Sequence, residues 1–368
     1  MLRDLRLAHQ QSGAMPGEMA VSQRELSAKY GLSVRTISIE LQKLVEEGVL
    51  YTVPRVGTFV GQPKAARDNL FVAIFAYLDK PNTQWAGVRN GFEGRIAELG
   101  GTSLVVDYET AAHFHGAGET APAGIFELRY PSAEPVWVEA GVPRVEFGEL
   151  GGGHPGADAV YFDNDDGGWK ATRHLLGLGH RKIAFMALHG EDENPGFFVW
   201  SQQREAGWRR ALEAAGLSAG GLAFRPPHTP GTDVGTIKIL AQEIAARLLE
   251  RDDITAVVAV NAHAAHGLFQ ALRAQNRPSA QWPAVVGFDT ELMQFSDDAM
   301  HLVTALRLPW EEIGREAAEL LWQRRHGLAQ APQQRLVPMI LIPRLSCRQE
   351  WHRAPGLASR SGQRVAVA

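Results

Sequence analysis

The chain has 368 residues with a formal net charge of −4 at pH 7, and 45% of them are hydrophobic. This length predicts two or three compact units of ordinary globular composition, and the slight acidity means that any surface for nucleic acid must be local. The single cysteine, Cys347, excludes a disulfide within the chain, and we find neither a signal peptide nor an apolar run long enough for a membrane span, so we expect a cytoplasmic protein.

Two short helices are predicted near the N-terminus. The first, over 22–30, begins with a capping box that Glu25 closes, and it ends at Gly31. The second, over 33–47, has a serine as its N-cap and carries apolar residues at helical spacing. Two helices joined through Gly-Leu-Ser have the pattern of a helix-turn-helix.

A hairpin is predicted directly after the second helix, because strands at 49–53 and 58–60 flank Pro54-Arg55-Val56-Gly57. The stretch MPGEMAVSQRELSAKYGLSVRTISIELQKLVEEGVLYTVPRVGTFV, which ends at Val60, resembles the GntR family of winged-helix repressors. The resemblance implies an N-terminal winged helix-turn-helix over 1–61 that binds operator DNA.

The same resemblance implies which residues contact the operator: Arg24, Ser33, Arg35, Thr36, Arg55 and Gly57. Hydroxyl groups and backbone N–H groups at a helix N-terminus suit phosphates, and arginine suits phosphates or guanine edges. Members of the family often carry arginine where this chain has Val34 and Ser38. We therefore expect fewer contacts to base edges, or that Arg35 makes these contacts.

The electrostatic attraction of this segment for DNA is weak. The first 64 residues hold eight Lys and Arg against six Asp and Glu, a net charge of +2. We therefore expect binding as a homodimer, in which two copies grip two half-sites. The alternative is a winged helix that serves protein contacts only.

A polar linker over 62–69 leads into a region where apolar strands alternate with helices. Apolar strands are expected at 71–77, 102–108, 159–162, 182–187, 256–260 and 284–288. Helices are expected at 169–178, 202–215, 237–250 and 264–275. This alternation predicts an α/β fold with a doubly wound parallel sheet, in which ligands bind at the carboxyl ends of the strands.

Three segments of this region resemble the sensor domain of the LacI family, which is built like the periplasmic sugar-binding proteins. They are VYFDNDDGGWKATRHLLGLGHRKIAFM, QQREAGWRRALEAAGL, and AVVAVNAHAAHGLFQAL followed by PAVVGFDTE. The resemblance implies a two-lobed effector domain over 70–348, with the effector between the lobes. It places lobe 1 at about 70–178 and 290–305, lobe 2 at about 180–288 and 306–346, and leaves a tail at 349–368 that we expect to be disordered.

Carried over by this resemblance, the residues expected to bind the effector are Trp85, Asp166, Arg204, His263 and Asp289. An indole covers the C–H face of a sugar ring, and charged groups bonded to hydroxyls give directional contacts. Arg204 is the strongest candidate, because we expect no other partner for it at the start of a helix. Trp85 and Asp289 have a structural alternative, as a core residue and as a lobe-crossing residue.

The pair Asn261-Ala262 departs from the family, which usually has Asn-Asp there, with the aspartate on the sugar. Either His263 takes over this role or the effector lacks the hydroxyl that the aspartate would meet. The sequence leaves open which sugar binds and whether it causes release from DNA or binding to it.

Catalysis is not expected, because the chain contains no nucleotide-binding, nucleophile-elbow or zinc-protease motif. His113-x-His115 and His263-x-x-His266 have metal-like spacing without further ligands close by in sequence, so we expect no metal and no cofactor. The function expected is a sequence-specific transcriptional repressor controlled by a sugar. The alternative is a sugar-binding protein of a transport system, or a sensor with no direct role at DNA.

Overall fold

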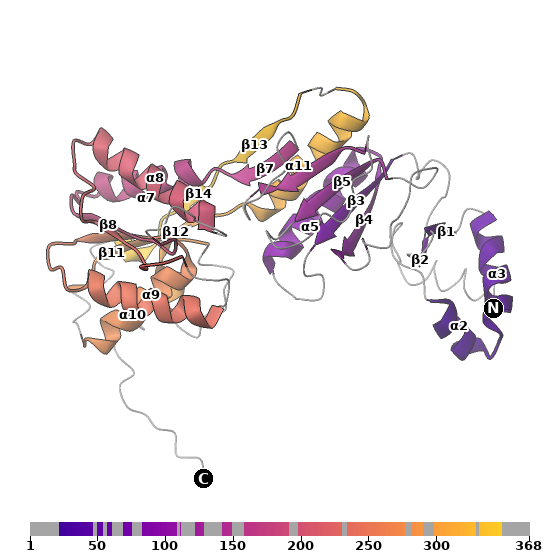
Figure 1. Ribbon diagram of the computed structural model, residues 1–368, viewed down its shortest axis with the longest axis horizontal. Coiled ribbons are helices and arrows are strands. Elements are labelled where there is room, and N and C mark those ends of the chain that lie inside the picture. The colour runs from indigo at the N-terminus through magenta and orange to yellow at the C-terminus, as the bar shows by residue number, and fades with distance from the viewer. Residues whose placement is uncertain are drawn as a thin grey trace, which may run out of the picture. The chain divides into compact units, whose positions relative to one another are not determined.

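The computed structural model describes fourteen segments of the chain (Figure 1). They are residues 22–46, 50–53, 57–60, 69–75, 83–108, 111, 122–128, 142–148, 158–190, 198–229, 234–276, 281–289, 298–328 and 331–347. Most of the expected linker and the expected tail lie outside the described residues. Within the described residues, no helix is both long and apolar enough to cross a bilayer.

The N-terminal segment contains two helices and a hairpin, as predicted. These are α2 (Gln23–Tyr30), α3 (Val34–Glu46) and the antiparallel pair β1 (Leu50–Val53) and β2 (Gly57–Val60). A small apolar core unites them, made by Leu26, Ile37, Leu41, Leu44 and Leu50. The α3 members recur at one position per helical turn, so this helix buries one stripe and exposes the rest.

The chain divides into two compact units, and each contains a six-stranded sheet. The first unit comprises residues 1–148, 152–161 and 310–335, and the second comprises 149–151, 162–309 and 336–368. Each unit therefore takes up chain segments that are distant in sequence.

The sheet of the first unit has the strand order β13-β7-β6-β5-β3-β4. The bounds are β3 (Leu70–Phe75), β4 (Thr102–Asp107), β5 (Gly124–Leu128), β6 (Arg144–Phe147), β7 (Asp158–Phe162) and β13 (Gln334–Val337). The pairs from β4 through β7 are parallel. Helices α5 (Thr83–Glu98) and α11 (Trp310–Arg325) pack against this sheet and against each other.

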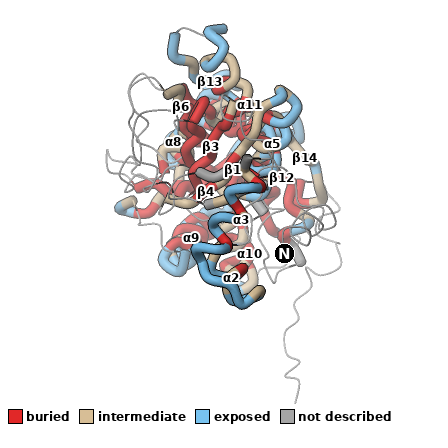
Figure 2. Tube along the Cα trace, turned by 90° about the vertical axis from the view of Figure 1, so that its right-hand side faces the viewer, coloured by how far each residue is buried: buried red, intermediate tan, exposed pale blue. Residues whose placement is uncertain are grey.

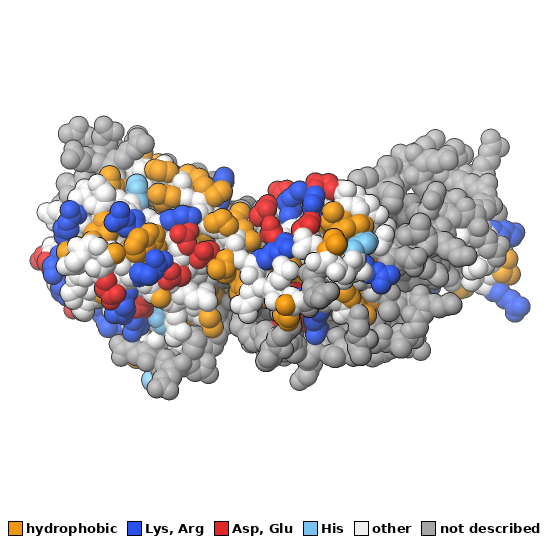
Figure 3. All heavy atoms as spheres, turned by 90° about the horizontal axis from the view of Figure 1, so that it is seen from above, with side chains coloured by type: hydrophobic (Ala, Val, Ile, Leu, Met, Phe, Trp, Pro, Cys, Tyr) orange, Lys and Arg blue, Asp and Glu red, His pale blue; other side chains and the backbone are white. Residues whose placement is uncertain are grey.

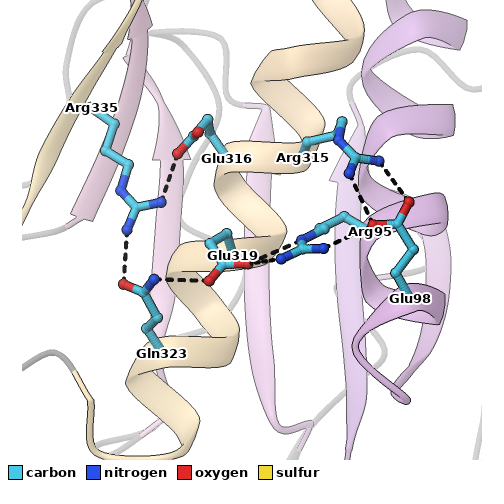
Figure 4. Close-up of polar contacts among 7 residues, drawn as sticks. All are labelled: Arg95, Glu98, Arg315, Glu316, Glu319, Gln323 and Arg335. Carbon is cyan, nitrogen blue, oxygen red and sulfur yellow. Dashed lines mark hydrogen bonds and ion pairs between the residues drawn. The ribbon is translucent and has the colours of Figure 1, made fainter.

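Glycines allow α5 and α11 to approach closely. A Cβ atom on Gly91 would lie 1.9 Å from the carbonyl oxygen of Glu311, and one on Gly314 would lie 2.0 Å from the carbonyl oxygen of Val88. Ion pairs bridge the same helices on their exposed side (Figure 4). There Glu98 pairs with Arg95 and Arg315, and a chain of contacts continues to β13 through Glu319, Gln323, Arg335 and Glu316.

The second unit is doubly wound. Its sheet has the order β14-β12-β11-β10-β8-β9, parallel except for β14 against β12. The strands are β8 (Ile183–Met186), β9 (Ala223–Phe224), β10 (Ala256–Ala259), β11 (Ala284–Phe288), β12 (Thr304–Arg307) and β14 (Ile340–Ile342). Helices α7 (Asn164–Gly177) and α8 (Val199–Ala214) cover one face, and α9 (Val234–Leu248) and α10 (Ala262–Ala274) cover the other (Figure 1). Short 3-10 turns lie at Asp298–Leu302 and Leu345–Cys347.

Helices α7 and α8 also meet through facing glycines. A Cβ atom on Gly168 would lie 2.0 Å from the carbonyl oxygen of Arg204, and one on Gly207 would lie 1.9 Å from the carbonyl oxygen of Asp165. Both units thus use a helix pair whose backbones nearly touch.

The expected lobe boundaries are wrong in three places. Residues 162–178 belong to the second unit, because α7 packs on α8 rather than on the first sheet. Residues 290–305 also belong to the second unit, since β12 pairs with β11 in parallel. Conversely, α11 belongs to the first unit, where it packs on α5. Within the described residues, the chain therefore changes units at 161/162, 309/310 and 335/336 rather than near 179, 289 and 305.

Candidate functional site

The turn between α2 and α3 is fixed by side-chain caps. Ser22 and Glu25 form a reciprocal capping box at the start of α2, and Gly31 ends that helix in the left-handed region with φ of 65°. The hydrogen bonds from Ser22 lower the pKa of Glu25, because they stabilise its charged form. The Ser27 hydroxyl donates to the carbonyl of Leu32 at 2.6 Å and closes the turn.

Ser33 begins α3 as the sequence predicts. Its Oγ accepts the backbone N–H of Thr36 at 3.1 Å and lies 2.8 Å from the Thr36 hydroxyl. Both side chains are exposed, as are Arg24 and Arg35. A helix N-terminus that presents hydroxyls and a nearby arginine suits a phosphate-lined surface.

Two of the expected DNA contacts lie in the hairpin. Gly57 is the first residue of β2 and pairs with Val53. Arg55 lies outside the described residues.

Arg204 lies at the carboxyl edge of the second sheet, in α8, and it is buried. Its Nε donates to the Oδ1 of Asn164 at 2.8 Å, and its Nη1 donates to the carbonyl of Val260, just after β10, at 2.7 Å. The guanidinium also lies over two rings, 4.8 Å from the centroid of Trp200 and 4.3 Å from that of Phe288. Cation–π contacts with these rings add to the hydrogen bonds that hold it.

The prediction that Arg204 would lack another partner is therefore wrong. Asn164 starts α7, and the Gly168–Gly207 approach of α7 to α8 brings its amide within reach of the arginine. The arginine is held in place by protein groups, so its orientation is set before any ligand arrives.

Asp289 immediately follows Phe288 at the end of β11 and is also buried. Its backbone has φ of 52°, in the left-handed region that non-glycine residues other than Asn and Asp seldom adopt. Its N–H donates to the carbonyl of Leu306 on β12 at 2.9 Å. The backbone at this strand end is thus held in a fixed conformation.

His263 lies in the first turn of α10, which Asn261 caps by accepting the N–H of Ala264 at 2.9 Å. Burial, with the charges of Lys238 and His266, lowers the pKa of His263 to about 4. The ring is therefore neutral near pH 7 and can both donate and accept a hydrogen bond. The adjacent Ala262 is buried and offers no polar side chain.

The other two expected effector residues have partners of different kinds. Asp166, in the first turn of α7, forms an ion pair with Lys170 at 2.6 Å. Trp85 belongs to the first unit, where its ring makes edge contacts with Trp310 at 5.7 Å and Phe147 at 6.4 Å between centroids. These three rings form an aromatic cluster in which Trp85 is half-buried. The structure brings Arg204, His263 and Asp289 to one sheet edge and leaves Trp85 in the other unit.

A second polar network lies beside this edge and was not predicted. His189, just after β8, contacts the Ser201 hydroxyl through Nδ1 at 2.8 Å and Glu205 through Nε2 at 3.1 Å. Arg209 and Arg225 also pair with Glu205. Burial raises the pKa of Glu205, but the hydrogen bonds and charges of His189 and Arg225 outweigh this effect and hold it at about 2. Ser201 and His189 are buried, so this network stabilises α8 rather than presenting a nucleophile.

The sequence held signals for the residues that were missed. Trp200 lies one turn before Arg204, the spacing at which helical side chains meet, and Phe288 directly precedes Asp289. Asn164 follows the strand β7 in the Asp-Asn-Asp-Asp run, in which only Asp166 was predicted as a site residue.

The family model described as a periplasmic binding protein-like domain matches residues 172–347. Regulators described as LacI-family members share its fold among the solved structures. The complex of the transcriptional regulator CelR with cellobiose has a TM-score of 0.57 to this chain at 23% identity, and the alignment covers 88% of this chain and 99% of that one.

The sequence relatives of this chain include transcriptional regulators. The HTH-type transcriptional regulator CelR of Thermobifida fusca is 32% identical over 214 residues, which cover 57% of this chain and 57% of that protein. The arabinose metabolism transcriptional repressor of Geobacillus stearothermophilus is 25% identical over 348 residues, which cover 85% of this chain and 86% of that protein. The match to CelR thus spans little more than half of that protein's length.

Proposed function

We propose that this protein is a DNA-binding transcriptional repressor controlled by a sugar. The observation that carries the proposal is the order of parts in one chain: a capped α3 with exposed Ser33, Arg35 and Thr36 precedes a periplasmic-binding-protein-like domain. Such a repressor acts in the cytoplasm, where it can reach operator DNA.

The DNA-binding part is proposed to be a winged helix of the GntR type. Support comes from the β1–β2 hairpin directly after α3, and from similarity to the arabinose metabolism repressor over most of the chain. In this proposal α3 enters the major groove with Ser33, Arg35 and Thr36, while Arg24 contacts the backbone and Arg55 and Gly57 lie at the tip of the wing. A charge reversal at Arg55 that leaves operator affinity unchanged would argue against the wing.

The sugar is proposed to bind at the edge where Arg204, Asp289 and His263 lie. Arg204 and Asp289 are held rigidly, so they can bond to hydroxyls without losing much conformational freedom. The half-buried Trp200 offers an indole face to the C–H groups of a sugar ring. Asp166 and Trp85 remain further candidate contacts, and the solved CelR complex contains cellobiose.

Regulation is proposed to work through a homodimer on an inverted repeat. Sugar binding would shift the equilibrium toward the conformation with lower operator affinity. A coupling free energy of about 1–3 kcal/mol would change that affinity roughly 5- to 150-fold.

The test is a thermal-shift screen of the full chain against cellobiose, arabinose, other pentoses and hexoses, uronic acids and sugar phosphates. A ligand of the folded state must raise the melting temperature by mass action. Arg204→Ala should abolish the shift, whereas Arg210→Ala, an exposed arginine on the same helix that pairs with Asp165, should preserve it.

Because Arg204 is buried, circular dichroism must first show that the Arg204→Ala variant is folded. If no sugar shifts the melting temperature, the carbohydrate proposal fails and nucleosides and amino-acid derivatives are screened next. A gel-shift with genomic DNA fragments tests the proposed DNA binding. If no fragment binds, a transport or sensor protein is favoured instead.

A further inference from the structure

The exposed side of α3 carries a row of residues that lies opposite its buried apolar stripe. Ile37, Leu41 and Leu44 face the core of the N-terminal segment. Because each residue of a helix turns by about 100°, the opposite side of the helix is formed by Arg35, Ile39 and Gln42, at spacings of four and three. All three are exposed, and Figure 2 shows the exposed surface of α3 along the helix.

Ile39 is the unusual member of this row. It is apolar and β-branched, yet 53% of its surface is exposed, and it lies one turn after Arg35. A single exposed apolar residue is ordinary on a protein surface, but this one occupies the middle of the face that would enter DNA. In Figure 3, hydrophobic side chains lie between basic ones on the segment that holds α2 and α3.

The charge around Ile39 also suits DNA. Arg35 precedes it by one turn, and Lys43 follows it by one turn. The nearby carboxylate, Glu40, is half-buried and forms an ion pair with Lys43 at 2.8 Å. The first two turns of the outward row therefore present a cation and an apolar group without an acid between them.

We infer that Ile39 reads the methyl group of a thymine beside a guanine that Arg35 reads. The inference rests on the proposed DNA-binding function. Thymine carries the one apolar group that a base displays in the major groove, and arginine is the usual partner of guanine O6 and N7. One helical turn advances about 5.4 Å, which is between one and two base steps of about 3.4 Å. Each operator half-site should thus hold the guanine and the thymine within two base pairs.

The experiment first enriches duplexes from a random pool with the full chain. Each thymine of one half-site is then replaced by deoxyuridine, which removes the methyl group and keeps the hydrogen-bonding groups. At one position the dissociation constant of the wild type should rise about fourfold, the size expected for one buried methyl group. Ile39→Ala should bind both duplexes equally, and Ile39→Val should keep a preference for thymine.

Lys43→Ala is the matched control. It should weaken binding to both duplexes alike and keep the thymine preference, because a phosphate contact carries no sequence information. The inference is overturned if the wild type is indifferent to every deoxyuridine, or if Ile39→Ala keeps the preference. Failure to enrich any duplex would instead overturn the DNA-binding proposal on which the inference rests.

Discussion

The substitution Gly207→Ala tests the close approach of α7 and α8, on which the Asn164–Arg204 contact depends. The added Cβ would lie 1.9 Å from the Asp165 carbonyl oxygen and 2.7 Å from the backbone nitrogen of Trp169, against 3.4 Å or more in an ordinary contact. Both neighbours are backbone atoms that cannot rotate away, so the helices must separate by roughly 1.5 Å at this point.

Overpacking of this kind costs about 1–3 kcal/mol and sometimes more, while alanine regains up to about 1 kcal/mol over glycine in a helix interior. We expect a net loss of about 2 kcal/mol in the free energy of unfolding of the second unit, which corresponds to a melting temperature lower by roughly 4–8 °C. Urea unfolding followed by circular dichroism measures the loss.

The control is Gly177→Ala at the end of α7, where a Cβ would meet nothing within 4 Å. This variant should match the wild type or exceed it slightly in stability. If Gly207→Ala stays within 0.5 kcal/mol of the wild type, a difference typical of a neutral surface change, the helices are not held by close backbone contact and the reasoning fails.

Three further predictions follow from particular contacts. Glu205 has a folded-state pKa of about 2 against the ordinary value of 4.5, so it contributes roughly 3 kcal/mol to the free energy of unfolding above pH 4.5, and this contribution is lost as the pH falls toward 2. Glu205→Gln should flatten the acid limb of a stability–pH curve, and an unchanged limb would refute this. Ser33→Asp should keep the N-cap of α3 and the melting temperature but lower DNA affinity at least tenfold through repulsion of phosphate, whereas equal DNA affinity would place Ser33 away from the DNA. Arg144→Met should cost about 3 kcal/mol by leaving the buried Glu127 without its ion pair, and the double substitution Glu127→Met with Arg144→Met should recover most of that loss in a double-mutant cycle; additive losses would contradict the pairing.

Local signals in the sequence were sufficient for much of the fold. The capping box at Ser22 and the hydroxyl at Ser33 correctly predict where α2 and α3 begin, because caps act over three residues. The continuous apolar strands of the second unit can also be predicted from the sequence, because a parallel sheet is buried on both faces.

Other features depended on contacts that no local pattern contains. The strands β5 and β6 were not predicted, because Glu127, Arg144 and Glu146 interrupt their apolar runs. The ion pair between Glu127 and Arg144 forms across the sheet and is not visible in a local pattern. The lobe boundary placed near 179 was wrong because the close approach of α7 to α8 at Gly168 and Gly207 is a contact between two helices that no local pattern contains. Arg204 was predicted as a site residue, but its protein partners, which lie 40 and 56 residues away in the sequence, were not predicted.

The first unit includes α11, which lies far along the sequence from most of the rest of that unit, and this has a consequence for biosynthesis. The helix that packs on α5 begins at Trp310, whereas the last strand of the preceding part, β7, ends at Phe162. At about 5–20 residues per second, roughly 7–30 s of synthesis separate the two. During that time the nascent chain lacks the surface that covers Phe71 and Gly124, which Trp322 and Leu321 of α11 contact in the finished protein. A ribosome-bound chain halted before residue 310 should therefore bind chaperones that recognise apolar surface, and release from them should await the synthesis of α11.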